Sequence, residues 1–218
     1  MTLILQGEID KLRRLISTLA TRVEESVRNA ATSIIERRPE LAVSVIDLDQ
    51  EIDDMEVEVE EECLKTLALH QPVAQDLRYI VTVLKMNNDL ERIGDLAKNC
   101  AQQSVHVAQE KELVIPYDLH GMAVKVQEML RNSLDALVES DSLLARSVLE
   151  ADDEVDAIDA QMYPEVQAAI REHPEQMQSL IRLLKVAQNL ERIGDHATNI
   201  AEDVIYLIEG EIVRHRGG

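Results

Sequence analysis

Apolar residues recur every three or four positions along most of this chain, which is the spacing of helices that bury one face. The first such run is Ile9, Leu12, Ile16, Leu19, Val23 and Val27. Proline residues and short polar segments interrupt the pattern near 38–39, 70–72, 111–121, 139–141 and 171–174. The pattern therefore predicts six helices, at residues 3–36, 39–69, about 73–109, 119–139, 142–170 and 175–208.

Two acidic motifs each occur twice. LERIGD stands at 90–95 and again at 190–195, and LDQEID at 48–53 is matched by ADDEVD at 151–156. Repetition after 100 to 103 residues indicates a tandem duplication. Long helices joined by short loops favour antiparallel neighbours. We therefore predict an all-α protein of two tandem, pseudo-symmetric three-helix bundles with six long antiparallel helices, at residues 1–110 and 117–212.

The composition agrees with an all-helical protein. The 218 residues include no Phe, no Trp and only seven Gly, and 45% of them are hydrophobic. Residues that favour strands and turns are thus scarce, whereas helix formers are abundant. Cys63 and Cys100 both lie within apolar helical patterns, so we expect them to be reduced and buried rather than bonded to each other or to a metal.

The chain is strongly acidic, with 42 Asp and Glu against 22 Lys and Arg and a formal net charge of −20. Such a surface repels nucleic acid and anionic lipid and favours cations or basic partners. No apolar run approaches the roughly 18 residues of a membrane-spanning helix. The first residues carry acids where a signal peptide has basic and apolar regions. We expect a cytoplasmic protein that binds no nucleic acid.

The repeated motifs place acidic residues four positions apart, so that both carboxylates project from one helix face with Cβ atoms roughly 5 to 6 Å apart. The pairs are Glu91 with Asp95, Glu191 with Asp195, Asp49 with Asp53, and Asp152 with Asp156, and Glu56 and Asp159 follow one turn after the last two pairs. At about 100° per residue, the acids of the LERIGD helix lie opposite its apolar stripe, and those of the preceding helix lie beside theirs. If the two helices are antiparallel, four carboxylates of each half converge on one shallow surface groove.

A glycine separates the two acids of each LERIGD motif, Gly94 in the first copy and Gly194 in the second. Glycine in a helix interior costs about 1 kcal/mol relative to alanine and offers no side chain to pack. Its recurrence predicts a close approach at this point by another backbone or by a ligand.

Three kinds of site fit such acidic clusters. The first is a solvated flank that basic neighbours partly neutralise. Those neighbours are Arg78, Lys85 and Arg92. The second is a site for hard cations, in which the amide oxygens of Asn99 and Asn199 join the carboxylates. The third is a di-iron centre within a bundle, which normally uses Glu-x-x-His, a pattern that this sequence lacks. His196 is replaced by Leu96 in the other copy, so we interpret it as peripheral.

The duplicated LERIGD, each copy followed by an Asn four residues after its Asp, together with DQEID and DDEVD, resembles the PhoU family, the accessory regulators of bacterial phosphate-specific transport. The resemblance covers nearly the whole chain and implies multinuclear iron or zinc clusters on the bundle surface, although Mg or Mn would also suit oxygen ligands. The ligands that it implies are Asp49, Asp53, Glu91, Asp95, Asp152, Asp156, Glu191 and Asp195. Further candidates are Glu56, Asn99, Asp159, Asn199 and Asp203.

The same resemblance implies regulation and not catalysis. PhoU-like proteins restrain the phosphate-starvation response by contacting the ATPase subunit of the phosphate transporter and a sensor histidine kinase, and they form homodimers. The membrane would then be reached only through the transporter. The alternatives are a metal-dependent enzyme resembling phosphohydrolases and an acidic helical scaffold without metal. Because the first copy has Asn88 and Asp89 where the second has Gln188 and Asn189, the two metal sites are expected to differ in nuclearity or affinity.

Overall fold

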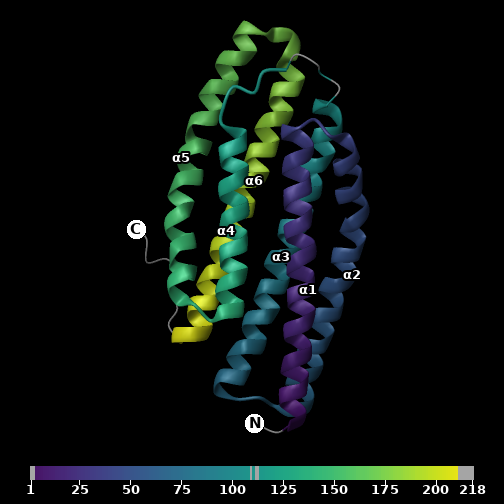
Figure 1. Cartoon of the computed structure of the whole chain (residues 1–218), viewed down its shortest axis with the longest axis vertical. Coiled ribbons are helices and arrows are strands. Elements are labelled where there is room, and N and C mark those ends of the chain that lie inside the picture. The colour runs from purple at the N-terminus through teal and green to yellow at the C-terminus, as the bar shows by residue number, and fades with distance from the viewer. Residues whose placement is uncertain (1–2, 109, 111–112, 211–218) are drawn as a thin grey trace.

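A computed structural model of the chain describes residues 3–108, 110 and 113–210, and they form an elongated helical protein (Figure 1). Each half consists of three long helices. The elements are α1 (Leu3–Ile35), α2 (Pro39–His70), α3 (Ala74–Val107), α4 (Leu119–Glu139), α5 (Ser142–Glu172), the short 3-10 helix η1 (Pro174–Gln176) and α6 (Met177–Glu209). The prediction of an all-α fold with tandem three-helix halves is confirmed, and no strand occurs among the described residues.

The helix ends agree with the sequence prediction to within a few residues. The one difference in kind is η1, a single 3-10 turn that includes residues 175 and 176, where the sequence predicted the first residues of the sixth α-helix. The predicted end of the third helix at Gln109 lies outside the described residues, and α3 ends at Val107. The domain bounds 1–110 and 117–212 stay a prediction, and position 212 also lies outside the described residues.

Side-chain caps explain where α4 and α5 begin. The Asp118 carboxylate accepts a hydrogen bond from the Gly121 amide at 2.8 Å and starts α4. The Asp141 carboxylate accepts from the amides of Leu143 and Leu144 at 2.8 and 3.0 Å and starts α5. Such caps satisfy backbone amides that the first turn of a helix leaves without partners. The two aspartates therefore set the residue at which each of these helices begins.

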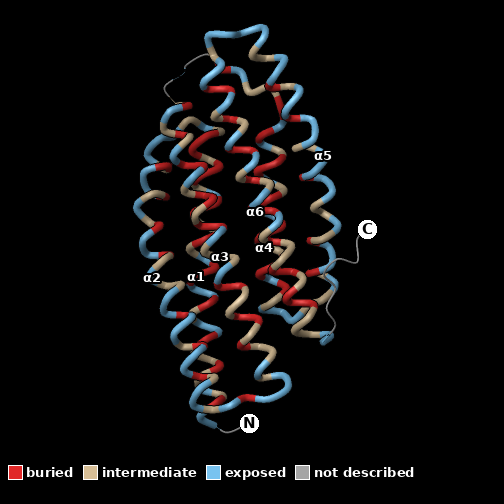
Figure 2. The backbone as a smooth tube through the Cα atoms, turned by 180° about the vertical axis from the view of Figure 1, so that it is seen from behind, coloured by how far each residue is buried: buried red, intermediate tan, exposed pale blue. Residues whose placement is uncertain are grey.

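The two halves share one hydrophobic core. Helix α3 packs along α6, and the buried residues of both halves form a continuous cluster that follows these two central helices (Figure 2). Cys63 and Cys100 lie within this core as free thiols, as predicted. Burial raises the pKa of the Cys63 thiol to about 12, which keeps it protonated and unreactive. Nothing in the sequence pattern indicated that the halves would pack along α3 and α6.

Polar contacts tie the connection between the halves to both of them. The Arg37 guanidinium at the end of α1 donates to the carbonyl oxygens of Glu110 and Leu113 at 2.9 and 2.8 Å. The Tyr117 hydroxyl donates to the carbonyl oxygen of Leu183 in α6 at 2.6 Å. The connecting segment is therefore anchored at both of its described ends. No helix of the described residues is long and apolar enough to span a bilayer.

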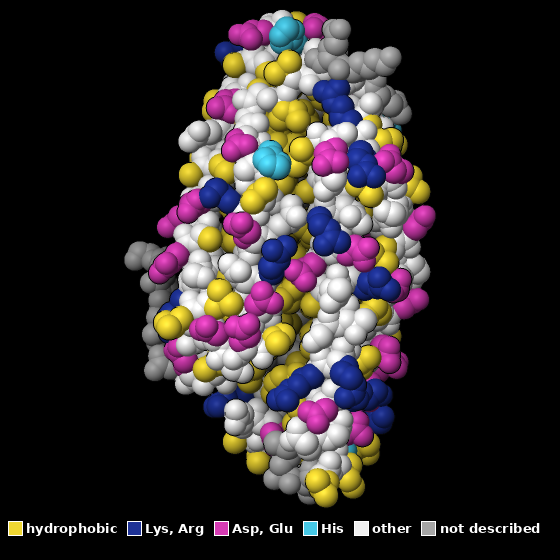
Figure 3. Space-filling view, in the orientation of Figure 1, with side chains coloured by type: hydrophobic (Ala, Val, Ile, Leu, Met, Phe, Trp, Pro, Cys, Tyr) yellow, Lys and Arg dark blue, Asp and Glu magenta, His cyan; other side chains and the backbone are white. Residues whose placement is uncertain are grey.

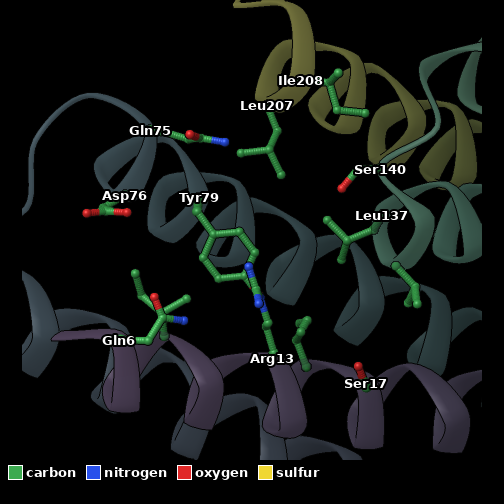
Figure 4. A pocket seen from close by; sticks show the side chains of 13 residues that line it. Gln6, Arg13, Ser17, Gln75, Asp76, Tyr79, Leu137, Ser140, Leu207 and Ile208 are labelled. Carbon is green, nitrogen blue, oxygen red and sulfur yellow. The ribbon is translucent and has the colours of Figure 1, made fainter. Parts of the chain in front are cut away.

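A furrow runs between α1 and α4 on the face shown in Figure 3, and hydrophobic side chains show within it among interspersed acidic and basic ones. At one end of this furrow a crevice of about 580 Å³ opens between α1, α3, α4 and α6. There the Arg13 guanidinium carbon lies 5.3 Å from the centroid of the Tyr79 ring (Figure 4). Asp76 is the one acidic residue among those that line the crevice, so it offers no carboxylate cluster.

Candidate metal centre

An open groove between α2 and α3 brings the acids of the first half together. Asp53 and Glu56 line it from α2, and Glu91 and Asp95 line it from α3, around a volume of about 640 Å³. Three of the four carboxylates that were predicted to converge, those of Asp53, Glu91 and Asp95, thus line one groove, together with the additional candidate Glu56. Helix α3 packs against α1, α2 and α6. Its two acids lie at the edge of the contact with α2, and they are therefore only half-buried.

The carboxylates of this groove raise one another's pKa. Burial first, and the negative charges of Asp49 and Asp95 second, raise the pKa of Asp53. Burial also raises the pKa of Glu91, with Asp95 and Asp53 adding to the effect. Arg92 opposes it, since its Nε lies 3.3 Å from Glu91 Oε2. The groove therefore carries more negative charge than its basic neighbours offset.

A lysine that the sequence analysis missed completes this cluster. Asp49 is nearly buried on α2, and its carboxylate accepts a hydrogen bond from the Lys98 ammonium of α3. Burying Asp49 is tolerable because this cation faces it. The sequence could have indicated this lysine, because Lys98 follows Asp95 by three positions and therefore lies on the same side of the helix.

Asn87 is a second residue that the sequence analysis missed. It is buried on α3, and its Nδ2 donates to the carbonyl oxygen and to Oε1 of Glu56, both at 2.9 Å. This contact fixes the Glu56 carboxylate at the edge of the groove. The Asn87 Oδ1 atom is buried and accepts no hydrogen bond within the described part of the chain. A buried acceptor in this condition is uncommon and suits a site that takes up a hydrated ion.

The second half repeats the cluster between α5 and α6. Burial, followed by the charges of Asp156 and Asp195, raises the pKa of Asp152 to about 6. Burial and four neighbouring carboxylates raise the pKa of Glu191 to about 7. Those neighbours are Asp195, Asp159, Asp156 and Asp152. The acids predicted for the second site, with the additional candidate Asp159, are therefore mutual neighbours.

Other predicted ligands lie elsewhere. Asn199 faces α3, and its Nδ2 is 3.4 Å from Asp89 Oδ1. His196 also faces α3, with Nδ1 2.8 Å from the same oxygen, in agreement with its interpretation as peripheral. Asp203 is buried two turns beyond Asp195, where the Lys85 ammonium donates to it at 3.0 Å across the junction of the halves.

Two further expectations about neighbours need correction. Asn99 is exposed at the surface of α3 and does not line the groove of the first half. Lys85 does not neutralise the acid pairs, because it reaches α6 instead, while Arg92 does lie beside them as expected.

The two glycines are approached by side chains. A Cβ built on Gly94 would lie 3.2 Å from Ile52 Cγ2, so α2 packs tightly at this point. A Cβ on Gly194 would lie 3.6 Å from Met129 Cε and 3.7 Å from Asp152 Oδ1, which is ordinary contact. Close approach is thus observed at Gly94, where the nearest atoms belong to a core side chain of the neighbouring helix and not to its backbone.

The donor set fits a hard cation, although its present arrangement is not a finished coordination site. Among the described residues, no three side chains of His, Cys, Asp or Glu are grouped as ligands around one point. Three features support this fit. The carboxylate oxygens are crowded, the Asn87 oxygen accepts no hydrogen bond within the described residues, and one cluster already binds a cation, the Lys98 ammonium. Carboxylate and amide oxygens are the ligands of Mg, Mn, Ca and ferric iron. Rotation of exposed carboxylates would be needed to bind an ion.

The raised pKa of Glu191 predicts how stability depends on pH in metal-free protein. Its pKa is about 7 in the folded protein against the ordinary value of 4.5 for a glutamate, so the folded state binds more protons than the unfolded state between these two pH values. The free energy of unfolding should then fall as pH rises from about 4.5 to about 7. Solvent screening of this half-exposed group limits the loss to about 1 kcal/mol.

Denaturant titrations with a chelator at pH 5 and pH 8 measure this slope. Glu191→Gln should flatten it, whereas Glu150→Gln, which changes an exposed acid of α5, should leave it as it is. An equal slope in all three proteins would contradict the assigned crowding.

Comparisons with known proteins agree with this arrangement. The PhoU domain family matches the chain twice, at residues 16–104 and 119–204. The phosphate-specific transport system accessory protein PhoU homolog of Aquifex aeolicus is 38% identical over 96% of this chain and 95% of its own. The homolog of the same name from Pseudomonas putida is 36% identical over 97% of this chain and 83% of its own. The crystal structure of PhoU from Pseudomonas aeruginosa superposes with a TM-score of 0.90 at 35% identity, covering 94% of this chain and 99% of that one.

Proposed function

Because this chain belongs to the PhoU family, we propose that it is a cytoplasmic accessory regulator of phosphate-specific transport that restrains the phosphate-starvation response. Relatives of matching length are named as accessory proteins of the phosphate-specific transport system. The proposed partners are the ATPase subunit of the phosphate transporter and a phosphate-sensing histidine kinase, and the proposed assembly is a homodimer. The role is one of binding and not of catalysis.

The observation that carries the metal-dependent part of this proposal is the recurrence of one carboxylate cluster at equivalent positions of the two halves. We call the site between α2 and α3 the first groove and the equivalent cluster between α5 and α6 the second groove. Asp53, Glu91 and Asp95 would hold a cation in the first groove, with Asp49 and Glu56 beside them. Asp152, Asp156, Glu191 and Asp195, with Asp159 beside them, would hold one in the second. Bound cations, whether iron, zinc, magnesium or manganese, would supply positive charge that offsets the crowded carboxylates. The surface that partners meet would then depend on metal loading.

Removing one acid pair from each groove tests the metal sites. The variant carries Glu91→Ala, Asp95→Ala, Glu191→Ala and Asp195→Ala. We expect elemental mass spectrometry to find bound iron, zinc or manganese in the unaltered protein and none in the variant. The melting temperature of metal-free variant should equal or slightly exceed that of metal-free parent, because like charges are removed. Metal at about 100 times its dissociation constant should stabilise only the parent, by about 2.7 kcal/mol per site.

A matched control removes the same amount of charge from outside the grooves. Glu58, Glu61, Glu139 and Glu150 are exposed acids that line neither groove. Their replacement by alanine should leave metal content and metal-induced stabilisation unchanged. Equal metal content in the groove variant and the parent would refute the assignment of these carboxylates.

Partner binding tests the regulatory role itself. The purified transporter ATPase subunit and the cytoplasmic part of the histidine kinase from the same organism serve as binding partners. We expect the metal-loaded parent to bind both, the groove variant to bind weakly, and the charge control to bind as the parent does. In cells that lack their own accessory protein, a reporter of the phosphate-starvation response should be repressed only by the parent and the control.

A further inference from the structure

The two carboxylate grooves differ in one internal cation. In the first half, the Lys98 ammonium of α3 donates a hydrogen bond to Asp49 of α2, so one carboxylate of the cluster is already paired. The hydrogen bond to Asp49, followed by that carboxylate's charge and those of Asp95 and Asp53, raises the pKa of Lys98 and keeps it charged. The lysine is thus held by several acids of the groove.

Thr198 occupies the equivalent position of the second half. Its hydroxyl donates back to the Asp195 carbonyl oxygen of its own helix at 2.7 Å, and its neutral side chain brings no positive charge to the carboxylates. Burial, followed by the charge of Asp156, raises the pKa of Asp195, and the basic groups His196 and Arg192 oppose this rise only in part. His196, however, is turned toward Asp89 of α3. The counterpart of Asp49 in this groove is Asp152, which lies among carboxylates.

An ammonium group and a divalent cation compete for the same carboxylate oxygens. A bound lysine occupies one carboxylate ligand and repels an arriving cation at close range, where the effective dielectric constant near a protein surface is lower than that of bulk water. We propose, on the basis of the metal sites assigned above, that Lys98 is a built-in counter-ion that weakens cation binding in the first groove. The second groove, with Thr198, is then the tighter site for a divalent cation.

Each groove can be measured alone when the other is disabled. Glu191→Ala with Asp195→Ala leaves the first groove, and Glu91→Ala with Asp95→Ala leaves the second. Manganese(II) is the probe, because the paramagnetic resonance signal of the free ion reports the unbound fraction directly. We expect the second groove to bind Mn²⁺ about 10- to 100-fold more tightly than the first, the range found when groups next to metal ligands are changed.

Exchanging the two residues tests the cause of the difference. Lys98→Thr should tighten Mn²⁺ binding in the first groove about 10- to 100-fold, and Thr198→Lys should weaken it by a similar factor in the second. Lys98→Arg keeps the charge and should leave the first groove weak. A further control, Lys65→Thr, removes an exposed lysine of α2 that pairs with Glu62 outside the groove and should change neither affinity.

Stability provides a second measurement that does not depend on the titration. Lys98→Thr takes a cation from the nearly buried Asp49, so the metal-free variant should melt lower, and Mn²⁺ should raise its melting temperature more than it raises the parent's. Thr198→Lys removes no partner from a buried acid, so it tests the proposal even if Lys98→Thr folds poorly.

The outcomes separate this inference from the proposed function. Equal Mn²⁺ affinities in the two grooves, unchanged by either exchange, would overturn the role of Lys98 while the metal sites stood. Absence of Mn²⁺ binding in both grooves, also after Lys98→Thr, would overturn the inference together with the metal-dependent part of the proposed function.

Discussion

Leu90→Ala should destabilise the protein by about 2 to 5 kcal/mol, the cost of a large cavity in a packed core. Leu90 lies inside the LERIGD motif, yet its side chain is fully buried and belongs to the shared core. Because that core runs through both halves, the loss should lower a single unfolding transition of the whole protein. Thermal and denaturant unfolding, followed by circular dichroism in the presence of a chelator, measures both the size and the number of transitions.

The repeat provides a matched variant for this experiment. Leu190 occupies the equivalent position of α6 and is 2% exposed, so Leu190→Ala should cost a similar amount. Leu90→Met conserves volume and should cost less than about 1.5 kcal/mol. Two separate transitions, with each alanine variant shifting only one of them, would show that the halves unfold independently and would contradict a common core.

Lys85→Met is expected to cost about 2 to 4 kcal/mol, somewhat less than the loss of one partner of a fully buried ion pair, because the Lys85 side chain is 39% exposed whereas that of Asp203 is 2% exposed. The Asp203 carboxylate is almost fully buried where α3 meets α6, and the Lys85 ammonium donates to it at 3.0 Å. The same ammonium lies 5.5 Å from the centroid of the Tyr206 ring. The variant removes this positive charge from beside the carboxylate. The free energy of unfolding near pH 7 is the quantity to measure.

Lys185 is the equivalent lysine of the second half and is exposed, so Lys185→Met should change stability by less than about 0.5 kcal/mol. Adding Asp203→Asn to Lys85→Met should recover part of the loss, because the buried charge disappears with its partner. Similar effects of Lys85→Met and Lys185→Met would mean that the ion pair contributes nothing to the junction of the halves.

Much of this fold was predictable because the relevant forces are local. The three-four spacing of apolar residues and the polar or proline-containing breaks located all six long helices, and Asp118 and Asp141 cap helices where breaks were expected. The repeat then predicted the number of helices in each half. The acidic pairs could be assigned to one groove per half because residues four apart share a helix face.

Contacts between distant helices could not be read in the same way. Lys98 was overlooked because its partner Asp49 lies 49 positions away, and only the packing of α2 on α3 brings them together. Asp203 and Asn199 were candidate ligands because they stand near LERIGD, but the packing of α6 on α3 turns them toward the other half. The apolar pattern shows that a face is buried and not which helix buries it.

The contacts between the two halves suit an origin by gene duplication and fusion. Within the described residues, the contacts between the halves join α3 to α6 and α1 to α4, which are helices at equivalent positions of the repeat. A half-length ancestor with this surface would pair with an identical copy around a twofold axis, and fusion of two such genes would produce the present chain. Fusion frees each half to mutate separately. A lysine at 98 and a threonine at 198 are substitutions that no symmetric ancestor could have combined.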